Sequence, residues 1–185
     1  MIFGMVILKN QRKLHIGGIE KKEGWEIFNI APSKDVEHIG NANDLSKFDN
    51  NTFAEIYVSH VLEHFDYRVE SHEALVEWHR VLEPKGKIYI SVPDLDVLSR
   101  LLLEKKDLTI SEQFEVMRIM YGGHVDEYDY HLMGFTKEFL SQYMKDAGFE
   151  NIKKVDNFGL FKDTSTLTFK DVPISLNITA TKLSK

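Results

Sequence analysis

The stretch Phe53–Phe65, FAEIYVSHVLEHF, decides the fold of this chain. Residues 53–59 are nearly all apolar, which is typical of a strand whose two faces are both covered. The second half begins at His60 and carries the pattern H-x-x-E-H, which Glu63 and His64 complete. A buried strand that runs directly into polar side chains indicates a ligand site at its end. The rest of the chain has to show what kind of ligand.

The pattern H-x-x-E-H also occurs in zinc peptidases, where two histidines bind the metal and the glutamate is the general base. Such ligands lie about one turn apart on a helix. His60 instead follows an apolar strand where the chain turns, and a third ligand is not identifiable, although Glu70, Glu73 and Glu77 stay open. We therefore predict no metal site here. Glu63 and His64 are expected to stabilise the turn through hydrogen bonds.

The composition indicates one ordinary globular domain, residues 1–185. The net charge is −6, and Lys and Arg are scattered, so no nucleic-acid surface is expected. There is no cysteine, which excludes disulfides, thiolate metal sites and a cysteine nucleophile. The first ten residues do not resemble a signal peptide, and no apolar stretch approaches the roughly 20 residues of a membrane span. We expect a cytoplasmic protein without a membrane span.

Strands and helices alternate around the opening stretch. Short apolar runs predict strands, and apolar residues at helical spacing predict helices. The expected strands are 12–18, 25–32, 36–45, 53–59, 87–94, 151–161 and 174–183, and the expected helices are 70–82, 96–106, 111–121 and 136–149. This order predicts an α/β fold of three layers, a mostly parallel twisted sheet with helices on both faces and an antiparallel C-terminal edge.

Ligands of such sheets lie outside the carboxyl ends of the strands. The strand ends here carry Gly17 and Gly18, then Asn29, then the segment 41–45, and finally Ser59 and His60. Glycine permits close approach of a ligand to the backbone, and amide side chains can bond sugar hydroxyls. Together these residue types indicate a nucleoside-sized ligand.

Residues 13–96 resemble the class I S-adenosylmethionine-dependent methyltransferases of the small type 11 kind, in a predicted bacterial branch. The resemblance is carried by LHIGG, NIAP, DLSKF, FAEIYVSHVLEHF and EWHRVLEPKGKIYISVPDLD, and residues 122–182 are similar to that branch as well. It implies a Rossmann-like fold, S-adenosylmethionine as cofactor and S-adenosylhomocysteine as product.

The resemblance also implies roles for particular positions. In that family the glycine loop contacts the methionine part of the cofactor, the end of the second strand holds the ribose, and the segment after the third strand contacts adenine. The end of the fourth strand lies beside the sulfonium. The matching cofactor-binding positions here are Gly17, Gly18, Asn29, Ile30, Asn43, Asp44, Leu45, Ser59 and His60.

The chain departs from the family pattern at three places. Ile19 stands where the second glycine of the loop is usual, and Asn29 stands where an acidic residue usually accepts both ribose hydroxyls. Only six residues separate Gly18 from Trp25, so the first helix after strand 1 is expected to be missing. A loop or a partner subunit would then form one wall of the cofactor site. An alternative to the enzyme is therefore a catalytically weak or inactive methyltransferase-like binding protein.

The segment 122–135, GGHVDEYDYHLMGF, is expected to be a loop at the family's variable substrate-binding position. Histidine has a suitable pKa for a general base, so His131 and then His124 are the candidate catalytic residues. Two alternatives stay open. Tyr128 and Tyr130 could instead pack under the cofactor site while the carboxylates stay solvated, or the loop could hold a divalent metal.

The expected partner is a small-molecule or saccharide substrate as methyl acceptor, since the acidic charge and the absence of a recognition module disfavour nucleic acid and protein acceptors. The sugar setting rests on the branch resemblance alone. The apolar segment Met1–Leu8 could pair with the edge of another chain, which allows a homodimer.

Overall fold

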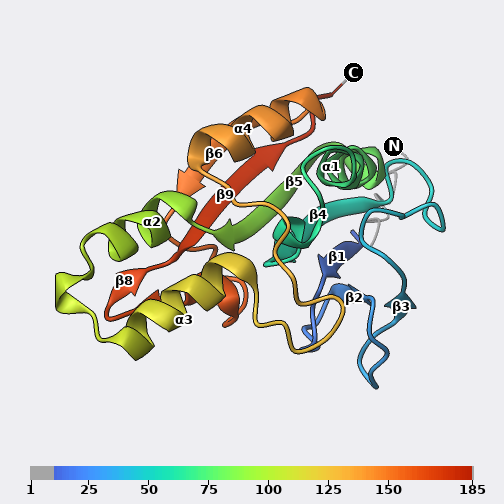
Figure 1. Cartoon of the computed structure of the whole chain (residues 1–185). Helices are drawn as coiled ribbons and strands as arrows, with labels where there is room; N and C mark the ends of the chain where they lie inside the picture. Colours follow the sequence, from blue (N-terminus) through green and yellow to red (C-terminus); the bar gives the residue numbers. More distant parts are fainter. Residues whose placement is uncertain (1–10, 185) are drawn as a thin grey trace, which may run out of the picture.

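The strand predicted from the opening stretch lies in the middle of the sheet. In this computed structural model, which describes residues 11–184, β4 (Phe53–Ser59) pairs on both sides in parallel, with β1 (Lys13–Ile16) and with β5 (Leu82–Pro93). The sheet order is β3-β2-β1-β4-β5-β9-β6 (Figure 1). The remaining strands of this sheet are β2 (Trp25–Asn29), β3 (His38–Ile39), β6 (Glu150–Val155) and β9 (Ser175–Thr181).

The pairing directions confirm the predicted sheet. Strands β3, β2, β1, β4 and β5 are parallel to their neighbours, whereas β9 runs antiparallel between β5 and β6. Pro84 and Gly86 lie inside β5, where the pairing register with β4 shifts between Phe53 and Glu55. A mostly parallel sheet with an antiparallel C-terminal edge is therefore present.

One face of the sheet carries the main core. Alternate residues such as Leu14, Ile56 and Ile90 are fully buried there, as the period of two in a strand requires. They pack against helices α1 (Glu70–Val81) and α4 (Lys137–Asp146), with Trp78 and Leu140 among the contacting side chains. Thr136, the first residue of the predicted helix 136–149, caps α4 by accepting from the Phe139 N–H.

On the opposite face, a loop of the described chain packs against the aromatic side chains of the sheet. Tyr57 and Tyr89 pack there against Phe158 and Phe161 of the segment 156–166, and the Tyr57 hydroxyl donates to the Asp163 carboxylate at 2.9 Å. The expected strand 151–161 therefore ends at Val155, and residues 156–161 continue as a loop over this face. The physical reason is that this face presents aromatic and polar side chains, which a loop can pair individually. In addition, β1 and β2 follow each other with no helix between them, as expected.

A second, smaller core lies beyond the carboxyl end of β5. Leu98 of α2 (Leu95–Leu103), Val116 of α3 (Ile110–Tyr121) and Ile174 form its centre. Figure 1 shows α2, α3 and the short strands grouped at this end of the sheet. The shorter elements are β7 (Thr168–Phe169), β8 (Val172–Pro173) and the 3-10 helices η1 (Leu62–His64), η2 (Lys105–Asp107) and η3 (Thr164–Thr166).

Within residues 11–184, no helix combines the length and the apolar character that crossing a membrane requires. The apolar segment Met1–Leu8, for which edge pairing with another chain was expected, lies outside the described residues.

Candidate functional site

A well-formed hollow lies at the carboxyl ends of β1, β2 and β4. Its volume is about 490 Å³. Gly17, Asn29 and His60 line it from the strand ends, and Tyr128 and Tyr130 line it from the loop 122–135. The cavity therefore lies at the edge of the sheet where the strand ends predicted a ligand site.

Gly17 and Gly18 are required at their positions by close contacts. Gly17 has a φ of 78°, and a Cβ there would lie 2.4 Å from Val61 Cγ2. A Cβ on Gly18 would lie 2.5 Å from Nδ1 of His15. The Gly17 N–H donates to the Phe28 carbonyl at 2.8 Å, which ties the loop to β2. These contacts keep the backbone bare where a ligand would approach, so the glycine cradle fits a nucleoside-type cofactor.

Asn29 ties the glycine loop to the end of β2. Its Nδ2 donates to the Gly18 carbonyl at 3.0 Å, and its Oδ1 accepts from the Ala31 N–H at 3.0 Å. An aspartate could accept from Ala31 but could not donate to Gly18. The hydrogen bond to Gly18 thus explains why residue 29 is an amide and not a carboxylate, which the sequence did not reveal. The Asn29 amide still has one N–H and one lone pair for a ligand.

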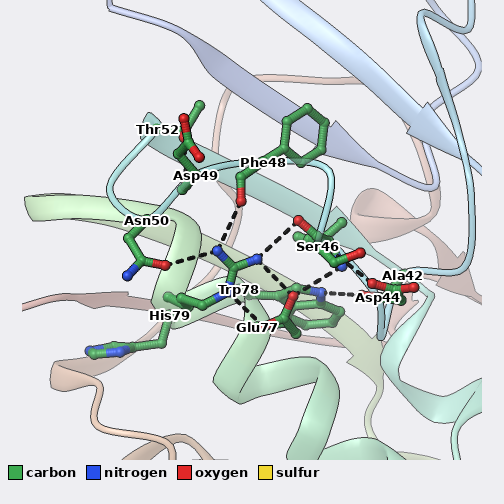
Figure 2. Close-up of polar contacts among 12 residues, drawn as sticks. Ala42, Asp44, Ser46, Phe48, Asp49, Asn50, Thr52, Glu77, Trp78 and His79 are labelled. Atoms are coloured by element: carbon green, nitrogen blue, oxygen red, sulfur yellow. Dashed lines mark hydrogen bonds and ion pairs between the residues drawn. The ribbon is translucent and has the colours of Figure 1, made fainter.

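Helix α1 holds the segment after β3 in place. The indole Nε1–H of Trp78 donates to the Ala42 carbonyl at 2.8 Å, and the guanidinium of Arg80 donates to the carbonyls of Leu45 and Phe48 at 2.9 Å each. Figure 2 shows this network, in which Glu77 also accepts from the Leu45 N–H at 3.1 Å. Glu77, Trp78 and Arg80 of the motif EWHR therefore hold this segment in place, and the Glu77 carboxylate already accepts a hydrogen bond here.

The cavity meets this segment at other residues than those predicted. Gly40, Asn41 and Ala42 line it, whereas Asn43, Asp44 and Leu45 line neither this cavity nor a smaller one beside it. The Leu45 side chain is fully buried in the main core, which turns it away from the cavity. Gly40 directly follows β3, so the strand-end rule applied strictly would have found it.

The smaller cavity, of about 330 Å³, lies between the glycine loop and residues 161–164. Gly18, Ile19 and Ser59 line it, and the Ser59 hydroxyl is bonded to Thr164 Oγ1 at 2.9 Å. Gly17 and His60 line both cavities. Of the predicted cofactor residues, Gly17, Asn29, Ile30 and His60 therefore share the larger cavity, and Gly18 and Ser59 belong to the smaller one.

His60 ends β4 in a left-handed backbone conformation, with a φ of 52°. Its Nε2 lies 3.0 Å from the Ser175 hydroxyl. Burial, and then the neighbouring His131, lower the pKa of His60 to about 3, so the ring is neutral at pH 7. A neutral imidazole at the strand end can bind a cation.

The Glu63 carboxyl group is unusual because it is buried without a hydrogen-bond partner among the described residues. Its side chain is 1% exposed, and neither of its oxygens has a hydrogen-bond partner among them. Burial raises its pKa to about 8. The expectation that its side chain would stabilise the turn is therefore wrong. Its backbone carbonyl instead accepts from the N–H groups of Leu132 and Met133.

The two histidines of the loop occupy different places, and neither lines the larger cavity. Nε2 of His124 lies 2.9 Å from the Tyr121 carbonyl, and its ring stacks on Tyr130. The His131 ring lies 4.8 Å from that of His64, and its Nε2 is 4.0 Å from Oε1 of Glu63. Burial, and then His64, lower the pKa of His131 to about 4.

The loop residues that do line the larger cavity are Glu127, Tyr128, Tyr130 and Leu132. The two tyrosines are 54% and 46% exposed, so they form a wall beside the cavity rather than a buried floor. His64 also lines the cavity, and its Nδ1 lies 3.2 Å from the Tyr130 carbonyl. Sequence reasoning missed His64 and Leu132 as lining residues, because their placement depends on the loop folding back over η1.

Comparisons with known proteins agree with this geometry. A family model described as a methyltransferase domain matches residues 15–154. No curated protein matches the sequence. A methyltransferase of Archaeoglobus fulgidus, described as S-adenosylmethionine-dependent, is 16% identical with a TM-score of 0.57, over 93% of this chain and 86% of that one.

Two further solved structures share the fold. A Thermotoga maritima protein, described as an S-adenosylmethionine-dependent methyltransferase and possible histamine N-methyltransferase, is 20% identical, with a TM-score of 0.53 over 95% of this chain and 84% of that one. A chain of the complex that contains the Haloferax volcanii Trm112 methyltransferase activator is 13% identical, with a TM-score of 0.55 over the same two shares. From its family match and its fold, the chain belongs to the class I S-adenosylmethionine-dependent methyltransferases.

Proposed function

We propose that this chain binds S-adenosylmethionine in the larger cavity and transfers its methyl group to a small-molecule or glycan acceptor. The observation that carries the proposal is the cavity itself, which opens at the ends of β1, β2 and β4 between a bare glycine loop and a tyrosine-lined wall. Its volume of about 490 Å³ is in the range of small-molecule sites.

The residues that would hold the cofactor follow from the geometry. Gly17 offers bare backbone for close approach, Asn29 has one amide N–H and one lone pair left for a ribose hydroxyl, and the backbone of 40–42 is held beside the cavity by Trp78. When bound, S-adenosylmethionine supplies a methyl group on a sulfonium, which a nucleophile can attack.

The chain's own contribution to the reaction is positioning and proton acceptance. Tyr128, Tyr130 and Leu132 form a partly apolar wall that excludes water from one side of the cavity. Tyrosine faces stack well on sugar rings and other flat or apolar acceptors, and their hydroxyls can bond polar groups. Among the lining groups, His64 carries an imidazole that can accept the acceptor's proton, whereas His60, with its pKa lowered to about 3, is too weak a base at pH 7.

A second candidate function is a methyltransferase-like binding protein without turnover. It is favoured by Ile19, which is 72% exposed at the usual second glycine position, and by the hydrogen bonds that occupy part of the Asn29 amide. In this case S-adenosylmethionine would bind and no acceptor would be methylated.

Isothermal titration calorimetry with S-adenosylhomocysteine tests the proposal. We expect one site per chain, and loss of binding when Gly40 is replaced by Val, since a Cβ there would lie 2.8 Å from Cζ of Phe28 at the cavity. Glu104→Gln at the end of α2 is the control and keeps the affinity. Absence of binding by the unmodified protein at millimolar ligand would reject the enzyme proposal.

A further inference from the structure

We propose that His60, Glu63, His64 and His131 form a binding site for one divalent transition-metal ion at the border of the larger cavity. Their side chains come from three elements, the end of β4, the 3-10 helix η1 and the loop 122–135. Metal binding stands independently of methyl transfer, whereas a catalytic role of the ion rests on the proposed function.

The distances suit a shared ion. The ligand atoms of Glu63, His64 and His131 all lie within 4.8 Å of one another. Nδ1 of His60 lies 3.4 Å from Oε1 of Glu63. Two ligands about 2.0–2.1 Å from a tetrahedral zinc ion are roughly 3.3 Å apart, so small side-chain rotations would complete the site.

Glu63 supplies an independent reason for a cation. It is a fully buried carboxyl group, and no described residue hydrogen-bonds to either oxygen. A buried carboxyl group avoids the cost of its charge either by keeping its proton or by binding a cation, and buried charges in proteins are paired or bind metals. Nδ1 of His60 lies 3.4 Å from its Oε1, and Nε2 of His131 lies 4.0 Å from the same oxygen.

The hydrogen bonds of His60 determine which of its nitrogens carries a lone pair. The Ser175 hydroxyl donates its proton to the Thr164 carbonyl at 2.7 Å, so it can only accept from Nε2–H of His60. Nδ1 of the neutral ring then has a lone pair that faces the Glu63 carboxyl group at 3.4 Å. Two acceptors so placed need a proton or a cation between them.

His64 is oriented in the same way. A carbonyl can only accept, so Nδ1 of His64 donates to the Tyr130 carbonyl at 3.2 Å and Nε2 keeps the lone pair. Such a hydrogen bond from the second ring nitrogen to a backbone carbonyl is the usual support of a metal-binding histidine. The motif H-x-x-E-H can thus provide metal ligands without lying on an α-helix. His131 of the loop 122–135 supplies the additional ligand.

The ligand set indicates which metal fits. Imidazoles with a carboxylate suit zinc, cobalt, iron and nickel, whereas magnesium and calcium prefer oxygen ligands. His60 and His64 line the larger cavity, so the open side of the ion would face a bound acceptor. A metal ion there would lower the pKa of an acceptor hydroxyl and align its oxygen for methyl transfer.

Cobalt titration of chelator-treated protein, without cofactor, tests the site. We expect one Co²⁺ per chain with a visible absorption band, displaced by Zn²⁺, and a higher Tm for the zinc-loaded protein. Glu63→Gln and His131→Ala should each lower the Co²⁺ affinity at least 100-fold. His72→Ala, an exposed histidine of α1, is the matched control and should bind like the unmodified protein.

The isosteric Glu63→Gln change keeps the test valid if other variants fold poorly, because it removes a buried charge and should fold without metal at least as stably as the unmodified protein. Equal Co²⁺ affinity of the unmodified protein and Glu63→Gln, or no binding at millimolar Co²⁺, would overturn the metal site. S-adenosylhomocysteine binding of the metal-free protein is measured separately, so failure of the metal site and failure of the proposed function remain distinguishable.

Discussion

Replacing Asn29 by Asp separates the role implied by family resemblance from the role in this structure. A carboxylate at the end of the second strand is the usual ribose ligand of the family, so the resemblance predicts that Asn29→Asp improves cofactor binding. The structure predicts the opposite, because Nδ2 of Asn29 donates to the Gly18 carbonyl at 3.0 Å and a carboxylate cannot donate.

The magnitude follows from that contact. Loss of the hydrogen bond destabilises the fold by about 1 kcal/mol, and two facing oxygens without a proton between them add roughly another 1 kcal/mol. The bond between the Ala31 N–H and the side-chain oxygen survives in the variant. A total of about 2 kcal/mol corresponds to a Tm lowered by roughly 4–8 °C for a chain of this size. If about half of this free energy is lost from the ligand-binding conformation of the glycine loop, the affinity for S-adenosylhomocysteine falls about fivefold.

The assay is thermal unfolding together with calorimetric titration of S-adenosylhomocysteine at pH 7. Asn157→Asp makes the same chemical change at an exposed position outside both cavities and controls for the added charge. An Asn29→Asp variant that unfolds at the parental temperature and binds tighter than the parent would refute the reasoning.

Three further predictions concern the surroundings of the site. Gly17→Ala should lose more stability than Gly24→Ala in urea unfolding, because both have positive φ but only Gly17 meets Val61; equal losses would contradict the close contact. Arg80→Met should lower the free energy of unfolding in urea by about 2–3 kcal/mol, because it removes the hydrogen bonds to the carbonyls of Leu45 and Phe48. Arg118→Met on the surface should lower it by less than about 0.5 kcal/mol. A similar loss in both variants would show that the bonds of Arg80 to this segment contribute little to stability. Burial lowers the pKa of His15 to about 4. Between pH 6.5 and 4, His15 therefore takes up a proton in the unfolded chain but not in the folded one. The free energy of unfolding should then fall by up to about 3 kcal/mol as the pH is lowered through this range. His15→Phe should flatten this part of the profile of unfolding free energy against pH, and an unchanged slope would refute the assignment.

Much of the sheet could be predicted because its signals are local. The nearly continuous apolar run 53–59 and the apolar alternation in 174–183 mark strands, and helical spacing in 70–82 marks α1. The missing helix after β1 followed from the short interval between Gly18 and Trp25. The cover of the second sheet face could not be predicted in this way, because Phe158 and Phe161 contact it only after the chain returns from β6.

The site was predicted in part for the same reason. Gly17, Asn29 and His60 stand at strand ends, and parallel strands bring their carboxyl ends to one edge, so their meeting follows from local signals and topology. The burial of the Leu45 side chain could not be predicted, because its direction depends on the main core, which no spacing in the segment encodes. The amide of Asn29 looked like a weakened ribose ligand until its bond to Gly18 was seen.

The stretch FAEIYVSHVLEHF by itself determined that a buried strand ends in polar residues at the ligand-binding edge of an α/β sheet. The tertiary structure alone decided what those polar residues can do. It buried the Glu63 carboxyl group and brought His131 beside it, because the loop 122–135 folds back over η1 and its backbone bonds to Glu63. A contact between residues so far apart depends on the path of the whole chain, which a short motif cannot specify.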